Sequence, residues 1–258
     1  MKQSKYIFFL LSGVFAFWSC SGSELSGDSA GDVSTQSLTL SISDRGFQDD
    51  SDMQTRTVMD DYPTTFVAGD KIGLFAVESG SLVDGIENLC LTAVDDGNGG
   101  INWDVENGYK LTREDVTYFA YFPYSEDFTD VYASSDDAFG FFFELTEAWN
   151  PDIDQSTSDK YKAQDLMFSK GSITENKLSF TMEHGGTLVI LDVASNTRFF
   201  NFSPYQMSDG KYYYLMNYGD LTGEYTNADN VVVRWRFEVS IPLGYYHLYT
   251  IDGGSATE

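Results

Sequence analysis

The sequence predicts an all-β protein, because short runs rich in aromatic and β-branched residues recur between turn residues along the chain. No segment of 11 or more residues holds the apolar spacing of an amphipathic helix. The 258 residues include 20 Phe, 17 Tyr and 4 Trp. Disordered acidic chains are poor in such residues, so this chain is expected to fold.

The first 19 residues have the order of a secretory signal peptide. A basic start is followed by an apolar run over residues 6–17, and Ser19 directly precedes Cys20. The apolar run is shorter than the roughly 20 residues that cross a bilayer. We therefore expect this segment to be removed and Cys20 to be lipidated, as in a bacterial lipoprotein; cleavage without lipidation is the alternative.

A flexible tether is expected over residues 20–35, which are nearly all small or polar. From Gln36 onward the pattern alternates, with Leu38, Leu40 and Ile42 on one face. This period of two is typical of a half-buried strand. A soluble, acidic stretch follows over residues 44–63.

The body of the chain then supplies further runs with the composition of strands. The clearest is near the end, where Val233, Trp235 and Phe237 alternate with charged residues and Pro242 ends the ladder. The runs cover residues 72–77, 86–94, 116–122, 139–145, 165–168, 178–182, 187–193, 198–203, 212–218, 231–241 and 245–251.

Strands at this spacing without crossover helices predict β-sandwiches rather than a parallel sheet. We expect an N-terminal sandwich domain over residues 36–172 and a C-terminal one over residues 173–258. The boundary rests on His184-Gly185-Gly186, which is interpreted as a hairpin turn inside one domain, with both glycines at positive φ.

Charge and composition exclude several functions. The chain has 15 Lys+Arg against 40 Asp+Glu, a formal net charge of −25, which repels nucleic acid. The two histidines, His184 and His247, leave little for a histidine triad or a zinc site. We predict no catalytic residue, metal ligand or cofactor, and no enzymatic activity. Calcium in an acidic loop stays open, and Cys90 is expected to be a buried structural residue of a strand.

Several short motifs then occur in a fixed order: Thr-Arg-Thr at 55–57, Phe-x-x-Gly-Asp-Lys-Ile-Gly-Leu-Phe at 66–75, Tyr-Phe-Ala-Tyr-Phe-Pro-Tyr at 118–124, Asp-Gln-Ser at 154–156, Asp-Leu-Met at 165–167, and Leu-Ser-Phe-x-x-x-His at 178–184. The ordered set resembles the fimbrillin (Mfa-like) family of Bacteroidales fimbrial lipoproteins.

This resemblance implies a structural or adhesive subunit of a surface fimbria, with two transthyretin-like β-sandwich domains. Stalk, tip and anchor roles all stay open. The implied location is the outer membrane, through lipidated Cys20, with exposure on the cell surface. Implied partners are other fimbrial subunits, of the same or a related kind, and a host or bacterial surface ligand. The 86 residues after the expected boundary are few for the family's second domain, so that domain is expected to be abbreviated or to lack its final strands.

In that family an arginine-specific protease clips the N-terminal segment, and a strand from a neighbouring subunit fills the vacated groove. Leu38, Leu40 and Ile42 form the candidate displaced strand here. Arg45 and Arg56 are the candidate cleavage residues, and Arg45 is slightly favoured because a cut there removes the whole strand and spares everything after it. A groove left by a missing strand exposes unpaired backbone groups and apolar pockets to an incoming strand. The alternative is an ordinary edge strand with two exposed arginines.

A surface glycan-binding lipoprotein is the alternative function. It would be distinguished by a cleft of exposed Trp and Tyr side chains. A lipid-anchored hydrolase has the least support, because it requires titratable groups that converge in a pocket.

Overall fold

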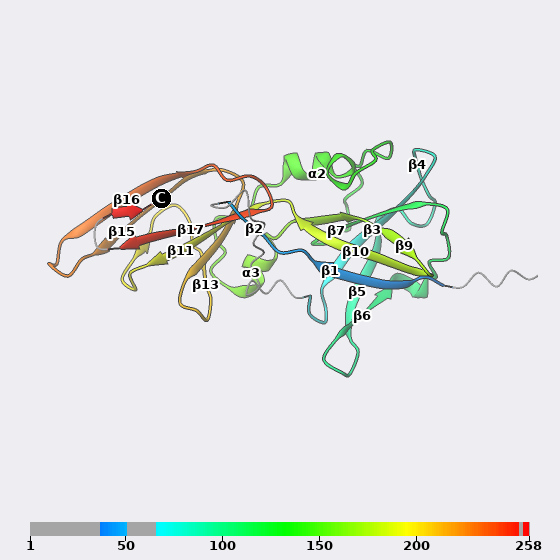
Figure 1. Ribbon diagram of the computed structural model, residues 1–258, viewed down its shortest axis with the longest axis horizontal. Helices are drawn as coiled ribbons and strands as arrows, with labels where there is room; N and C mark the ends of the chain where they lie inside the picture. The colour runs from blue at the N-terminus through cyan, green and yellow to red at the C-terminus, as the bar shows by residue number, and fades with distance from the viewer. Residues whose placement is uncertain (1–36, 51–65, 253–254, 258) are drawn as a thin grey trace, which may run out of the picture. The chain divides into compact units, whose positions relative to one another are not determined.

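The computed structural model describes residues 37–50, 66–252 and 255–257 (Figure 1). Within these ranges the chain consists mostly of β-strands, with a few short helices, and the sheets contain both parallel and antiparallel pairs. The predicted all-β class is therefore confirmed. The transthyretin-like character of the sheets stays a prediction. The expected signal peptide, the tether with Cys20, and Arg56 lie outside the described residues.

The first sheet follows the order β1-β10-β8-β7-β3-β5-β6, with β4 on β3 and β9 on β10. Strands β1 and β6 lie at the two ends of this order and still contact each other, so the sheet curves around one of its faces. The bounds are β1 (Thr39–Asp44), β3 (Lys71–Glu78), β4 (Ser81–Leu82), β5 (Leu89–Asp95), β6 (Ile101–Val105), β7 (Thr117–Phe122), β8 (Met167–Lys170), β9 (Ser172–Thr174) and β10 (Lys177–His184).

Apolar side chains cover both faces of this sheet. The core inside the curve, here called the inner core, includes Leu74, Leu91 and Phe180. On the outer face, Phe75 and Phe119 pack against two short helices, α1 (Ala138–Phe141) and α2 (Phe143–Ala148). Because both faces are covered, strands such as β3 and β7 are buried along most of their length rather than at alternate residues.

The helices α1 and α2 correct the prediction of a strand over residues 139–145. Asp137 caps the first helix by accepting a hydrogen bond from the Gly140 N–H at 2.7 Å. Phe141 and Phe142 are both fully buried. Consecutive residues of a strand point to opposite faces, whereas the helical turn places both rings in one core.

The second half of the chain, together with β2, forms two further sheets (Figure 1). Side chains of the two sheets share one core. One has the order β13-β14-β11-β17-β18 with β2 on β17, and the other the order β12-β15-β16. Tyr214 and Leu191 from the former meet Trp235 and Phe237 from the latter, as the alternation over residues 231–241 predicts. The bounds are β2 (Gln48–Asp49), β11 (Thr187–Val193), β12 (Arg198–Phe199), β13 (Tyr205–Gln206), β14 (Tyr212–Met216), β15 (Gly219–Thr226), β16 (Val232–Val239), β17 (Tyr245–Asp252) and β18 (Ser255–Thr257).

The predicted hairpin at His184-Gly185-Gly186 is wrong, because β10 pairs within the first sheet and β11 within the second. Neither glycine has a positive φ. Gly185 is required for a different reason: a Cβ there would lie 2.8 Å from the Phe168 ring and 2.9 Å from Leu166. Strand pairing therefore changes at this dipeptide, and β9 and β10, which the boundary at residue 172 assigns to the second domain, pair with the first sheet. The division into two domains stays a prediction.

Gly73 in β3 provides a test of the packing. A Cβ at this position would lie 2.0 Å from the Tyr121 ring and 2.6 Å from Asn88 Oδ1, and the Tyr121 hydroxyl donates to that same oxygen at 2.9 Å. We expect Gly73→Ala to lower the free energy of unfolding by about 2 to 3 kcal/mol in urea denaturation, since overpacking forces a buried ring to move. Gly186→Ala is the control, because its Cβ would come no closer than 3.8 Å to a neighbour. Equal losses in the two variants would contradict this account.

Candidate functional site

Strand β1 lies at the edge of the first sheet and pairs with no other described strand than β10. It lies alongside β10 (Figure 1) and runs parallel to it, with Leu40 opposite Leu178 and Ile42 opposite Phe180. Leu38 is buried, and Leu40 and Ile42 are half-buried against the inner core. The structure thus brings the three residues of the candidate displaced strand together on one face of an edge strand; their displacement stays a prediction.

A buried ion cluster lies where β1 ends. The side chain of His184, the last residue of β10, is 0% exposed. Its Nδ1 lies 2.7 Å from Asp165 Oδ1, and its Nε2 lies 3.0 Å from Asp44 Oδ1. Asp44 is the last residue of β1, whereas Asp165 comes from the loop between α3 (Ser158–Lys162) and β8. The histidine therefore connects β1 to the rest of the protein, here called the body and taken as residues 66–252.

The two carboxylates keep this histidine charged. Burial by itself favours the neutral imidazole, but the charge and hydrogen bonding of Asp165 and Asp44 outweigh it and raise the pKa of His184 to about 9. Burial also raises the pKa of Asp165, against the lowering effect of the histidine. On α3, burial and the same two carboxylates hold the pKa of Tyr161 well above its usual value. At neutral pH the cluster is an imidazolium between two acidic side chains.

Phe47 covers one face of the His184 ring. Gly46, with φ of 74°, turns the chain after β1, and the Phe47 ring then stacks on His184 with centroids 3.7 Å apart and 17° between the planes. The ring is fully buried and also packs against Leu188 and Tyr213 of the second sheet. Because β2 follows at once and pairs with β17, one short segment contributes a strand to each of two sheets.

Arg45, the favoured cleavage residue, lies within this fastened segment. Its N–H donates to the Met182 carbonyl at 2.9 Å, and its guanidinium forms an ion pair with Glu183. Its side chain is 37% exposed. Proteases act on exposed backbone that can leave its hydrogen bonds, so these contacts oppose a cut at this position. Arg56 lies outside the described residues, and cleavage at either arginine stays a prediction.

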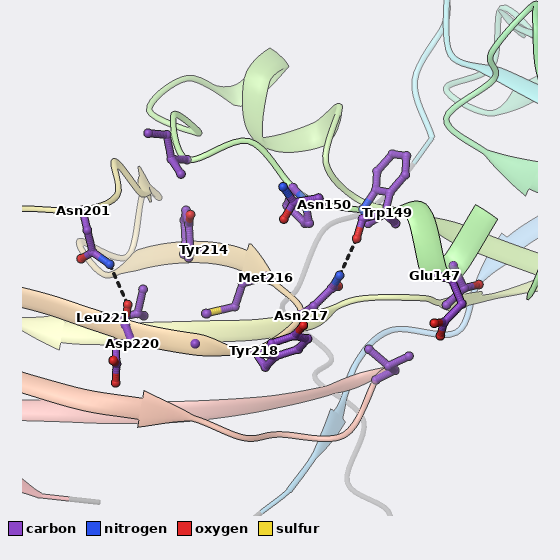
Figure 2. Close-up of a pocket in the computed structure, with 15 residues that line it drawn as sticks. Glu147, Trp149, Asn150, Asn201, Tyr214, Met216, Asn217, Tyr218, Asp220 and Leu221 are labelled. Carbon is purple, nitrogen blue, oxygen red and sulfur yellow. Dashed lines mark hydrogen bonds between the residues drawn. The ribbon is translucent and has the colours of Figure 1, made fainter. Parts of the chain in front are cut away.

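A separate pocket of about 700 Å³ lies where residues 146–153 approach the turn between β14 and β15 (Figure 2). Its aromatic lining includes the half-buried Trp149 and the exposed Tyr218, a residue with 83% relative exposure. Asn217 fixes the two sides together by donating from its amide to the Trp149 carbonyl at 2.5 Å. Polar side chains along the same pocket are those of Glu147, Asn150, Asn201, Asn217 and Asp220. The pocket thus combines one exposed tyrosine with a half-buried tryptophan, so it only partly matches the cleft of exposed Trp and Tyr side chains that would distinguish the glycan-binding alternative.

The remaining sequence-based interpretations concern Cys90 and the acidic loops. Cys90 is buried and unpaired, and burial raises the pKa of its thiol, in agreement with a structural role. The Asp95-Asp96 loop is the hairpin turn between β5 and β6. Within the described ranges, no group of three or more His, Cys, Asp or Glu side chains is placed to hold a metal ion. None of the helices in this part of the chain is long and apolar enough to cross a membrane.

The sequence does not predict the contacts among the four residues of the cluster, which are Asp44, Phe47, Asp165 and His184. Asp165 and His184 belong to the motifs at 165–167 and 178–184, but no local sequence pattern indicates that their side chains are in contact. Asp44 and Phe47 fell in a stretch interpreted as soluble. The one available signal was a buried-type residue, Phe47, within an otherwise acidic segment.

Asp44→Asn tests the charge on the cluster. Because the folded pKa of His184, about 9, lies above its ordinary 6.5, the charged cluster stabilises the protein fully below pH 6.5, and this stabilisation is lost as pH rises through 9. We expect the substitution to lower the free energy of unfolding by about 2 kcal/mol near pH 6, with a smaller loss above pH 9, in urea denaturation. Asp192→Asn, an exposed change on β11, should cost under about 0.5 kcal/mol at both pH values. A loss that does not depend on pH would refute the role of the ion pair.

The chain is similar to known proteins over most of its length. A family model described as fimbrillin-like matches residues 55–250. A protein of Bacteroides ovatus named as a fimbrium tip subunit, Fim1C, is 31% identical over 211 residues, which are 78% of this chain and 37% of that protein.

Two solved structures are also similar. One is a fimbrial protein from Bacteroides ovatus, with a TM-score of 0.66 and 25% identity over 84% of this chain and 49% of that one. The other, a protein from the same organism named as a cell adhesion protein, has a TM-score of 0.50 and 14% identity over 84% of this chain and 92% of that one, which is a likeness of fold alone. The chain thus spans less than half the length of Fim1C and of the fimbrial protein. Since the family match covers most of its residues, this protein belongs to the fimbrillin-like family.

Proposed function

We propose that this protein is a structural or adhesive subunit of a cell-surface fimbria, that it assembles with other fimbrial subunits by strand complementation, and that it acts by binding rather than catalysis. The observation that carries the proposal is β1, an edge strand parallel to β10 whose apolar residues rest on the inner core. Membership of the fimbrillin-like family and the similarity to Fim1C support it. Attachment to the outer membrane through lipidated Cys20 belongs to the same proposal.

In this mechanism a strand from a neighbouring subunit takes the place of β1. It gains backbone hydrogen bonds along the edge of β10, and it buries apolar side chains where Leu38, Leu40 and Ile42 now lie. Both gains need the native strand to leave first. The ordering of the incoming segment opposes them, so a well-matched strand is required for a stable assembly.

The contacts described above bear on where a protease would cut. A cut after Arg45 would require its bonds to Met182 and Glu183 to open, and it would leave Phe47 in place. A cut after Arg56 would release β1, Phe47 and β2 as one piece. We therefore favour Arg56 over Arg45 as the first cleavage residue.

Assembly is tested by incubating the full-length lipoprotein with an arginine-specific protease, followed by electrophoresis without boiling. We expect a ladder of multimers from the parent protein. The double variant Arg45→Ala with Arg56→Ala should remain a monomer, because neither cut can release β1. Arg234→Ala, an exposed arginine of β16, is the matched control and should still form the ladder. Assembly undiminished in the double variant would exclude clipping as the trigger.

Glycan binding is the second candidate function, and the pocket beside Trp149 and Tyr218 favours it. Sugar rings stack their C–H faces on aromatic rings, while amide and carboxylate groups such as those of Asn150 and Glu147 bind their hydroxyls. The pocket carries acidic rather than basic side chains, which suits a neutral sugar better than an acidic one.

Tyr218→Ala tests this second function on an array of neutral glycans. We expect binding to weaken by about fivefold or more, since the loss of one stacked ring costs about 1 kcal/mol. Tyr109→Ala, another exposed tyrosine that does not line the pocket, serves as the control. If neither the parent protein nor the control variant binds any glycan, the pocket has another role.

A further inference from the structure

We propose that a strand that replaces β1 must carry a carboxylate at the position of Asp44 and an aromatic side chain three residues later, at the position of Phe47. This inference rests on the proposed function, because it specifies the partner strand. It concerns recognition at the end of the groove, beyond the apolar residues that any β-strand can offer.

The requirement for a carboxylate follows from the part of the cluster that does not move. His184 and Asp165 both belong to the body, where their side chains are 0% and 2% exposed. When β1 leaves, Asp44 leaves with it, and the carboxylate 3.0 Å from His184 Nε2 is lost. A buried imidazolium that loses one of two acidic neighbours is destabilised, so an incoming acidic side chain restores what the native strand supplied.

The ladder fixes where this carboxylate must lie along the strand. Parallel pairing places Asp44 opposite Met182, and the next N–H, that of Arg45, donates to the Met182 carbonyl at 2.9 Å. Ile42, two residues earlier, lies over the inner core. A slip by one residue turns every side chain to the other face, so apolar contacts and the ion pair can form together only in one register.

The requirement for an aromatic side chain follows from the packing of Phe47. The Phe47 ring is fully buried, lies 3.7 Å from the His184 ring, and packs with Tyr161, Leu188 and Tyr213. Its absence would leave a cavity against a charged histidine. A short strand that ends at the carboxylate therefore fills only part of the site.

The fitting partner is a segment with the pattern apolar-x-apolar-x-apolar-x-acidic-x-Gly-aromatic. Residues 38–47 of this chain have that pattern, so an uncleaved second copy presents it as readily as a related subunit. The glycine matches the φ of 74° at Gly46. The overall charge of −25 would by itself favour a basic incoming strand. If an acidic strand binds better, the cause is therefore the local cluster at His184 and not the overall charge.

Peptide exchange on the full chain tests this inference. A protease recognition sequence is inserted between Asp50 and Phe66, the folded protein is cut there, and fluorescent peptides of residues 37–49 compete with the native segment. The series comprises the parent peptide, Asp44→Asn, Phe47→Ala and the control Ser41→Ala. We expect the first two variants to bind at least about tenfold more weakly than the parent and the control to bind within about twofold of it, in fluorescence anisotropy.

The outcomes separate this inference from the proposed function. If the parent peptide exchanges and Asp44→Asn binds equally well, the carboxylate requirement is overturned while strand replacement stands. If the parent peptide never exchanges, strand replacement is overturned and this inference with it. A body that carries His184→Gln should bind the parent peptide and the Asp44→Asn peptide within about threefold of each other. If the His184→Gln variant still binds the parent peptide tenfold more tightly than the Asp44→Asn peptide, a group other than His184 recognises the carboxylate.

Discussion

The contact of His184 with two aspartates determines how the N-terminal segment attaches to the rest of the protein. Asp165 holds one nitrogen of the ring and Asp44 the other, so the histidine can be fully buried and still carry charge. The turn at Gly46, the burial of Phe47 and the pairing of β2 with β17 all follow from the place where β1 stops.

Besides its backbone hydrogen bonds to β10, two kinds of side-chain interaction hold β1, and they have different effects. The apolar side chains on the inner core supply burial, which is non-directional and tolerates many sequences. Compared with apolar residues of the same volume, the buried ion pair adds little net stability, because desolvation of the charges offsets much of their attraction. It nevertheless penalises every arrangement that leaves a charge without its neighbour. The apolar residues of β1 thus supply most of its affinity for the β10 edge, whereas the ion pair of Asp44 with His184 determines its register.

Two binding regions are proposed in this fimbrillin-like protein: the edge of β10, which β1 covers in the structure, and the pocket at Trp149 and Tyr218. The β10 edge suits an extended chain, because backbone groups and a row of apolar side chains are repeated along it. The pocket at Trp149 and Tyr218 suits a compact ligand, because aromatic and amide groups converge there from two segments of the chain. The two proposals can therefore be tested by separate substitutions, since no residue of the ion cluster lines the pocket.

The sequence by itself determined the fold class, the ends of β11 and the buried face of β16, because the composition of a strand is a local property and so is the alternation along β16. It failed at residues 139–145, where an aromatic run forms helices because both adjacent phenylalanines must reach one core. Only the tertiary structure decided that β10 belongs to the first sheet, and that Asp44 and Phe47 meet His184. Arg45 and Glu183 illustrate the reason: they are 138 residues apart along the chain, and no local pattern records which distant segment a strand will choose as its neighbour.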